Sequence, residues 1–182
     1  MLLSFLFLFF GVAFVNGQNI QVKKKYYLTG ELQSKGHYKD GKEDGLVTWW
    51  YIDGKKKREV SFKNGNEDGL RTDWYPSGGK KFEIYYKDGK EEGLYIGWYE
   101  SGEKKFEQYF KDGKEDGVQT GWYKSGKKEY EHHYKDGKED GFQTDWNENG
   151  YKQRENFYKD GKEYDKGLEE YDNVKNKLVF PA

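Results

Sequence analysis

A segment of eight residues that returns every 24 residues constrains the fold of this chain more than any other feature. It reads Tyr/Phe-Lys-Asp/Asn-Gly, then a polar residue, two acidic residues and a glycine. Its copies begin at Tyr38, Phe62, Tyr86, Phe110 and Tyr134, with an altered copy at Tyr158. A second marker keeps the same step, at Tyr26, Trp50, Trp74, Trp98, Trp122 and Trp146. A fixed period of this length predicts stacked repeats, each burying its apolar face against its neighbours.

Composition leaves room for one ordered domain. Charged residues make up 36% of the 182 residues and the mean hydropathy is -1.23, values that alone would favour disorder. Aromatic residues reach 19%, however, and they occupy fixed repeat positions. The net charge is -1 with alternating signs, so no footprint for nucleic acid appears. The absence of cysteine excludes disulfides and thiolate metal sites.

Each 24-residue unit contains two short runs separated by turn sequences. The units are 22–45, 46–69, 70–93, 94–117, 118–141 and 142–165. Within a run, apolar residues alternate with polar ones, which is typical of strands, and Asp-Gly or Ser-Gly supplies the positive φ of a tight hairpin. We therefore expect an all-β fold: an elongated antiparallel meander of six 24-residue β-hairpin repeats, about 12 strands, in a solenoid-like array.

The alternation also predicts which side chains share a face. Leu70, Thr72 and Trp74 fall on one side of their run, and the tryptophan column is interpreted as core. The tyrosine that follows each tryptophan should point the other way, toward a column of glutamates on the face opposite Phe82. The predicted interaction surface therefore consists of Tyr75, Tyr99, Tyr123, Glu83, Glu107 and Glu131. Substituting the three tyrosines together should spare folding and weaken a partner, because tyrosine is favoured at interfaces.

The two ends of the chain differ from the repeats. Residues 1–15 are almost continuously apolar and too short for a spanning helix, so residues 1–17 are predicted to be a signal peptide, leaving Gln18 as the first mature residue. An uncleaved anchor or a buried apolar segment is the alternative. The repeat domain would cover residues 18–167, and residues 168–182 would form a C-terminal cap.

The repeat unit resembles the MORN repeat, and more closely its second variant, found in bacterial proteins labelled YwqK-type antitoxins. The resemblance rests on the Tyr/Phe-Lys-Asp-Gly-Lys-x-x-Gly segments and on the Trp-Tyr-x-x-Gly segments at Trp74, Trp98 and Trp122, and it covers residues 22–165. It implies an elongated all-β scaffold that makes protein contacts or, in some members, lipid contacts. Exported proteins of this class resemble surface or envelope factors, including adhesion-associated ones.

Catalytic and metal-binding interpretations are weaker than structural ones. Read as a calcium loop, the segment from Asp40 lacks two required oxygens, at Lys42 and Tyr51, so hairpin turns explain it better. Glutamates of one column lie ~10 Å apart, too far for an acid/base pair. His132 and His133 are adjacent in a strand and point to opposite faces, which disfavours a shared metal. No catalytic, metal or cofactor-binding residue is predicted.

The sequence thus favours an exported, non-enzymatic protein that serves as a protein-interaction or adhesion scaffold, secreted or in the cell envelope. The expected partner is another protein, not nucleic acid, with no integral membrane segment once the signal peptide is removed. Pairing of open sheet ends would permit end-to-end self-association. The alternatives are an antitoxin or immunity-like protein that neutralises a toxin, and a carbohydrate-binding module in which the tryptophans stack on sugars.

Overall fold

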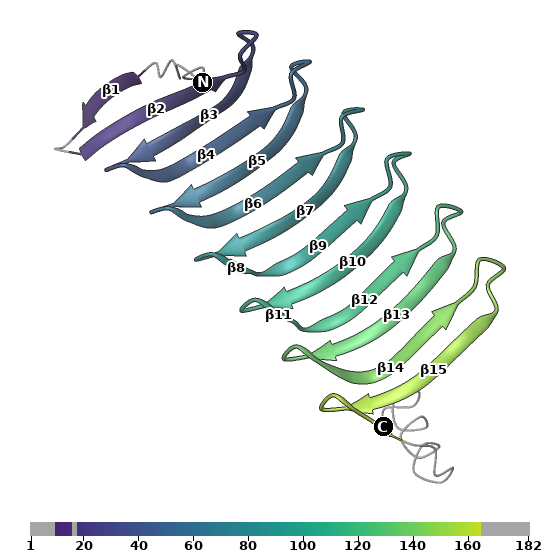
Figure 1. The fold of residues 1–182 in the computed structure, drawn as a ribbon. Coiled ribbons are helices and arrows are strands. Elements are labelled where there is room, and N and C mark those ends of the chain that lie inside the picture. The colour runs from purple at the N-terminus through teal and green to yellow at the C-terminus, as the bar shows by residue number, and fades with distance from the viewer. Residues whose placement is uncertain (1–9, 16–17, 165–182) are drawn as a thin grey trace, which may run out of the picture.

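The computed structural model describes residues 10–15 and 18–164, and in this part of the chain every regular element is a strand. One antiparallel sheet of 16 strands follows chain order (Figure 1). Its strands are β1 (Phe10–Val15), β2 (Gln18–Tyr26), β3 (Leu32–Lys39), β4 (Lys42–Trp50), β5 (Lys56–Lys63), β6 (Asn66–Trp74), β7 (Lys80–Lys87), β8 (Lys90–Glu91), β9 (Gly93–Trp98), β10 (Lys104–Lys111), β11 (Lys114–Glu115), β12 (Gly117–Trp122), β13 (Lys128–Lys135), β14 (Lys138–Trp146), β15 (Lys152–Lys159) and β16 (Lys162–Glu163).

The predicted all-β meander is confirmed. Strands β8 and β9 together occupy the place of one long strand, as do β11 and β12, so the 14 labelled strands from β2 to β15 reduce to the predicted twelve. The sheet forms a single layer, and each strand is bowed along its length (Figure 1).

Two kinds of turn line the two long edges of the sheet (Figure 1). The short turns carry an Asp or Asn at φ near 50° before a glycine, as at Asp88 (φ 49) and Gly89 (φ 80). This geometry is that of the type I′ hairpin turn that the sequence predicted. Each short turn also binds the preceding hairpin, since the Gly89 amide donates to the Glu67 carbonyl at 2.8 Å and the Asp88 amide to the Asp68 carboxylate at 3.2 Å. The acidic residues of the repeat therefore bond successive hairpins to one another.

Strand register divides the side chains into two faces. Thr72 lies directly opposite Glu83, and Asp73 directly opposite Phe82, before a β-bulge between Asp73 and Trp74. We call the side that carries Thr72 and Glu83 the glutamate face, and the side that carries Phe82 and Ile84 the aromatic face. Leu70, Thr72 and Trp74 share a face as predicted, but it is the glutamate face. Thr72 is buried there, whereas Leu70 is exposed and Trp74 is half-buried, so the tryptophan column is not the fully buried core that the sequence suggested.

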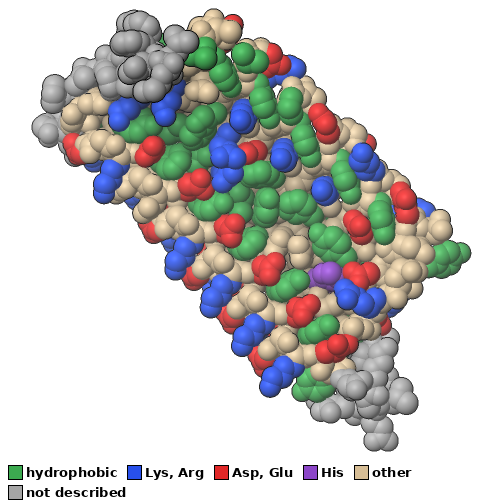
Figure 2. Space-filling view, in the orientation of Figure 1, with side chains coloured by type: hydrophobic (Ala, Val, Ile, Leu, Met, Phe, Trp, Pro, Cys, Tyr) green, Lys and Arg blue, Asp and Glu red, His purple; other side chains and the backbone are tan. Residues whose placement is uncertain are grey.

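The tightly packed centre lies on the aromatic face. Val47, Val60 and Ile84 are only 3%, 1% and 2% exposed. Rings cover two strand glycines there: the Phe106 ring lies over Gly97, and the Tyr130 ring over Gly121. These glycines are packing positions, not turns. Figure 2 shows one face of the sheet, on which hydrophobic side chains gather along the middle of the strands while basic and acidic side chains alternate along one edge.

The first strand falls within the predicted signal peptide. Strand β1 pairs with β2 along its whole length, from Phe10 opposite Lys23 to Val15 opposite Gln18. The predicted cap, residues 168–182, lies outside the described residues, as do residues 1–9 and 16–17. Within residues 10–15 and 18–164 there is no helix long and apolar enough to cross a membrane.

Candidate interaction surfaces

The predicted glutamate column is a row of internal ion pairs. Lys80 Nζ lies 2.7 Å from Glu83 Oε1, and Lys104 Nζ lies 2.7 Å from Glu107 Oε2. The Thr72 hydroxyl donates to Glu83 from the neighbouring strand at 3.2 Å. The hydrogen bond from Lys128 lowers the pKa of Glu131. These carboxylates are thus held by groups of their own 24-residue unit.

The tryptophan column lies beneath lysines of the same row. The ammonium of Lys80 stands 5.8 Å from the centre of the Trp98 ring, and that of Lys104 stands 5.1 Å from Trp122. Lys56 and Lys128 cover Trp74 and Trp146 in the same way. The tryptophans are half-buried. In four successive repeats, one lysine therefore contacts both a glutamate of its own repeat and the tryptophan of the next repeat, which makes a cation–π and ion-pair network along the sheet.

The predicted tyrosine column joins consecutive hairpins. The Tyr75 hydroxyl donates to the Trp98 carbonyl oxygen at 2.9 Å, and the Tyr99 hydroxyl to that of Trp122 at 2.7 Å. The same bond recurs from Tyr27, Tyr51 and Tyr123 to Trp50, Trp74 and Trp146. These hydroxyls satisfy carbonyl groups in the turn that follows each tryptophan. The column is a structural staple between repeats, so the expectation that its loss spares folding is not supported by the geometry.

The structure does not bring the tyrosine and glutamate columns together as one surface. Burial is the main cause that raises the pKa of Tyr51, and the charge of Asp73 raises it further. Asp73 lies on the aromatic face. Burial likewise raises the pKa of Tyr99, followed by the charges of Glu129 and Glu148. Whether Tyr75, Tyr99, Tyr123, Glu83, Glu107 and Glu131 contact a partner stays a prediction.

An exposed apolar stripe on the glutamate face was missed by the sequence analysis. Leu70 lies opposite Tyr85, and the two side chains are 48% and 47% exposed. The neighbouring hairpins extend the stripe with equally exposed side chains, at Leu46, Tyr109 and Val118. We call these five residues the apolar stripe. The sequence did contain a signal for this stripe, because the residue immediately before each Tyr/Phe-Lys-Asp/Asn-Gly segment varies between repeats. It is Ser61, Tyr85, Tyr109, His133 and Phe157 in successive repeats.

Charged groups on the aromatic face are paired with one another. Asp73 accepts hydrogen bonds from Arg58 Nε at 3.0 Å to each carboxylate oxygen, and from Arg58 Nη2 at 2.7 Å. Arg71 Nε donates to Asp73 at 3.1 Å, and its guanidinium lies 5.2 Å from the Phe82 ring. His132 Nε2 lies 2.9 Å from Asp145. These groups stabilise the packed centre by pairing with one another.

The histidines lie on opposite faces, as predicted, because His132 is opposite Gln119 and His133 is opposite Val118. No group of three or more His, Cys, Asp or Glu residues suited to a metal occurs in the described part of the chain. Outside the predicted column, burial raises the pKa of the Glu91 carboxyl group, and the charge of Glu115 adds to this. No nucleophile is placed beside it among the residues described.

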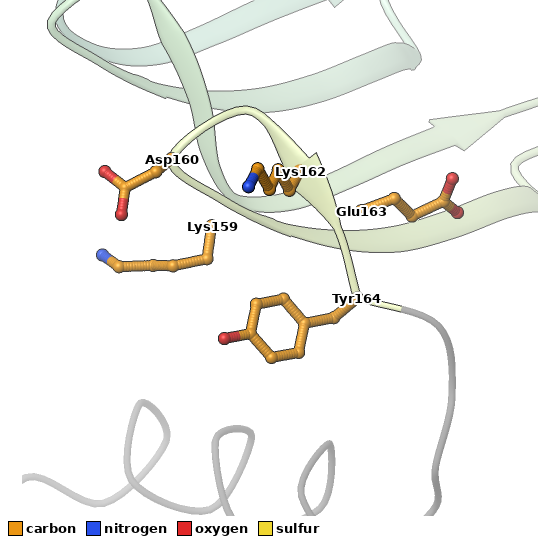
Figure 3. A pocket seen from close by; sticks show the side chains of 5 residues that line it. All are labelled: Lys159, Asp160, Lys162, Glu163 and Tyr164. Atoms are coloured by element: carbon orange, nitrogen blue, oxygen red, sulfur yellow. The ribbon is translucent and has the colours of Figure 1, made fainter.

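Two small hollows lie at opposite ends of the array. One of about 420 Å³ lies at the last short turn and is lined by Lys159, Asp160, Lys162, Glu163 and Tyr164 (Figure 3). Its charges balance, and Lys159 is held by Asp140 outside it. The other, of about 210 Å³, lies near the first hairpin and is lined by Lys25, Tyr27, Gln33, Ser34, Trp49, Trp50 and Lys57. Trp49, which lines this hollow, stands where the next hairpins have Asp73, Gly97 and Gly121.

The fold and its repeated inter-hairpin bonds define a single-layered β repeat array. The sequence profile of the MORN repeat variant matches residues 22–40, 43–64, 67–88, 91–112 and 115–136. These matches cover more than half of the chain, so the chain belongs to the MORN repeat variant family. Repeats of this family generally mediate protein or membrane interactions, and the family is typically a non-enzymatic scaffold. A search of curated proteins found no match to the chain.

Proposed function

We propose that this chain is an exported interaction scaffold that binds a partner protein through the apolar stripe. The single observation that carries the proposal is the stripe itself. Leu46, Leu70, Tyr85, Tyr109 and Val118 are each at least 37% exposed and follow one another across four hairpins. Contiguous exposed apolar side chains rimmed by charges are typical of protein-binding surfaces.

The rows of side chains beside the stripe support this assignment because they are already bonded to one another. The glutamates, lysines and tryptophans beside the stripe already bind one another, so they hold the geometry of the face. The stripe residues Tyr85 and Tyr109, by contrast, have no hydrogen bond from their hydroxyls among the described residues. Their rings and hydroxyls remain available, and tyrosine loses little conformational freedom on binding. Export is proposed from the apolar leader of residues 1–17.

Site-specific photo-crosslinking in an exporting host tests the proposal. A photoreactive residue at position 109 should crosslink one envelope or secreted protein, whereas the same group at position 151 should not. Tyr151 is the matched control, since it is 71% exposed but lies in a turn outside the stripe. The binding of that protein should weaken at least tenfold in a Tyr85→Ser/Tyr109→Ser variant. Equal crosslinking at both positions would contradict the proposal.

A second candidate function, carbohydrate binding, is favoured by the hollow around Trp49 and not by the tryptophan column. Trp49, Trp50 and Tyr27 supply aromatic surface there, with Gln33 and Ser34 as hydrogen-bonding groups. The rings of the column are covered by lysines. Glycan-array binding lost in Trp49→Ala and retained in Trp122→Ala would support this candidate. Glycan binding that is lost in Trp122→Ala and retained in Trp49→Ala would instead place the sugar site at the tryptophan column.

A further inference from the structure

The predicted leader continues the repeat. The first glycines of the short turns fall at Gly41, Gly65, Gly89, Gly113, Gly137 and Gly161, and one more step of 24 backwards gives Gly17. The preceding residue is Asn16, so the leader ends on the same Asn-Gly dipeptide that forms the turn at Asn64 and Gly65. Strand β2 also begins 24 residues before β4 and ends 24 residues before it.

Strand β1 occupies the place that a repeat strand would take. Its six residues pair antiparallel with β2, and Val15 opposite Gln18 leaves only two residues between the strands. This is the spacing of the short hairpin turns, in which Lys63 lies opposite Asn66. The predicted cleavage point, after Gly17, therefore falls at the junction of two paired strands.

We infer that cleavage after Gly17 converts β2 into an open edge that accepts an extended segment of a partner protein by strand addition. The inference rests on the proposed export of the chain. Removal of residues 1–17 takes away β1 and leaves the nine residues of β2 without a neighbour on that side. Unpaired N–H and C=O groups of an edge strand are a template for another strand. The pairing of β1 with β2 shows that a six-residue strand fits this edge in antiparallel register.

The main-chain groups involved follow from the other side of β2. The Asn19 carbonyl accepts the Asp40 amide at 2.9 Å, and the Asn19 amide donates to the Asp40 carboxylate at 3.2 Å. Asn19 thus points both of its main-chain groups away from β1. Because these directions alternate along a strand, the main-chain groups of Ile20 and Val22 point toward β1 and become free when it leaves, and those of Lys24 point to the same side.

The charges of β2 define the chemistry of the partner. Lys23, Lys24 and Lys25 follow one another near its end. Lys23 lies 4.0 Å from the Tyr38 ring, but Lys24 and Lys25 have no ion pair among the residues that the structure describes. A strand with apolar residues opposite Ile20 and Val22, and acidic residues opposite Lys24 and Lys25, complements this edge. The partner segment is therefore apolar at one end and acidic at the other.

A peptide built on β1 is the probe. Two glutamates added before the sequence of residues 10–15 would lie opposite Lys24 and Lys25, since Phe10 lies opposite Lys23. The full gene is expressed in an exporting host, and the product is purified and its intact mass measured. A product that begins at Gln18 should bind the Glu-Glu peptide, with slowed hydrogen exchange at Ile20, Val22 and Lys24. A Lys-Lys version should bind at least tenfold more weakly, and a Lys24→Glu/Lys25→Glu variant should reverse this preference.

A Val22→Pro variant should abolish peptide binding while keeping the fold, because proline is tolerated where an edge N–H faces solvent. A product that begins at Gln18 but shows neither binding nor slowed exchange overturns the inference and leaves export standing. A product that retains β1 overturns the inference too. In that case photo-crosslinking at position 109 still tests, independently, whether the apolar stripe binds a partner. The cleaved product could instead associate with itself. If Val22→Pro abolished this self-association, a second copy of the chain would be shown to fill the edge, which also contradicts a separate partner protein.

Discussion

Deletion of the tyrosine hydroxyls tests the account of how the repeats are held together. We consider the variant Tyr75→Phe/Tyr99→Phe/Tyr123→Phe, which removes three hydrogen bonds of 2.9, 2.7 and 2.8 Å to carbonyl groups of the next hairpin. The rings stay in place, so packing changes little. Each such bond contributes about 1 kcal/mol. The three sites are 24 residues apart and share no partner, so their effects should add to about 3 kcal/mol.

Urea unfolding followed by tryptophan fluorescence is the measurement, because each lost bond ends on a tryptophan carbonyl. The matched control is Tyr85→Phe/Tyr109→Phe/Tyr151→Phe, which deletes three hydroxyls from side chains that are 47%, 48% and 71% exposed. The control should change the free energy of unfolding by less than about 0.5 kcal/mol. The unfolding midpoint of the first variant should fall with an unchanged slope.

Equal stability of the two triple variants would refute the reasoning. It would mean that water replaces the tyrosine hydroxyls without loss and that the column is available for other contacts. In that event the prediction that a partner protein binds Tyr75, Tyr99 and Tyr123 would be favoured again. A large loss in the control alone would instead show that the stripe residues carry stability.

Three further predictions address the buried glycines and the titrating groups. Gly121→Ala should cost about 1–3 kcal/mol in unfolding experiments, since an added Cβ would lie 2.2 Å from the Tyr130 ring, and the cost should nearly vanish in a Tyr130→Ala background. The lowered pKa of Glu131, caused by Lys128, contributes stability that is present above the pKa of the unfolded chain and is lost as the pH falls below about 4; Glu131→Gln should flatten this acid limb of the stability–pH curve. Burial raises the pKa of Tyr95, so its contribution is present below about pH 10 and is lost as the pH rises through the higher folded value; Tyr95→Phe should lose less stability above pH 10 than the parent, and an equal loss would contradict this assignment.

The period and the turns could be read from the sequence because they depend on local chemistry. An Asp-Gly or Asn-Gly dipeptide forms a two-residue hairpin turn in many contexts, and the step of 24 places every strand. Face assignment failed because it depends on register between runs. The bulge between Asp73 and Trp74 and the longer turn after it set Thr72 opposite Glu83. A shift of one residue exchanges the two faces, and alternation within a single run cannot reveal it.

The roles of the candidate residues could be predicted only in part, because their partners lie one repeat away. The Tyr75 hydroxyl binds a main-chain carbonyl 23 residues further on, and a carbonyl leaves no mark in the sequence. The glutamate column was recognised, yet its threonine donors were assigned to the other face. Gly97 lies in a strand beneath the Phe106 ring, a contact that can be predicted only when the register is known.

Differences between repeats mark the surface that is free to recognise a partner. Positions filled by the same residue in successive hairpins, such as the tyrosine, tryptophan and glutamate columns, bond within their own hairpin or to a neighbouring one and are constrained by those contacts. The position of Tyr85 is Ser61 one repeat earlier and His133 two repeats later, and it faces solvent at Tyr85. A Ser61→Tyr variant should therefore extend the stripe by one ring, because Tyr85 and Tyr109 already show that the position accepts one. We expect tighter binding of the crosslinked partner, by about 1 kcal/mol or fivefold, with an unchanged unfolding midpoint. Unchanged affinity would confine the recognition surface to the hairpins that already carry the tyrosines.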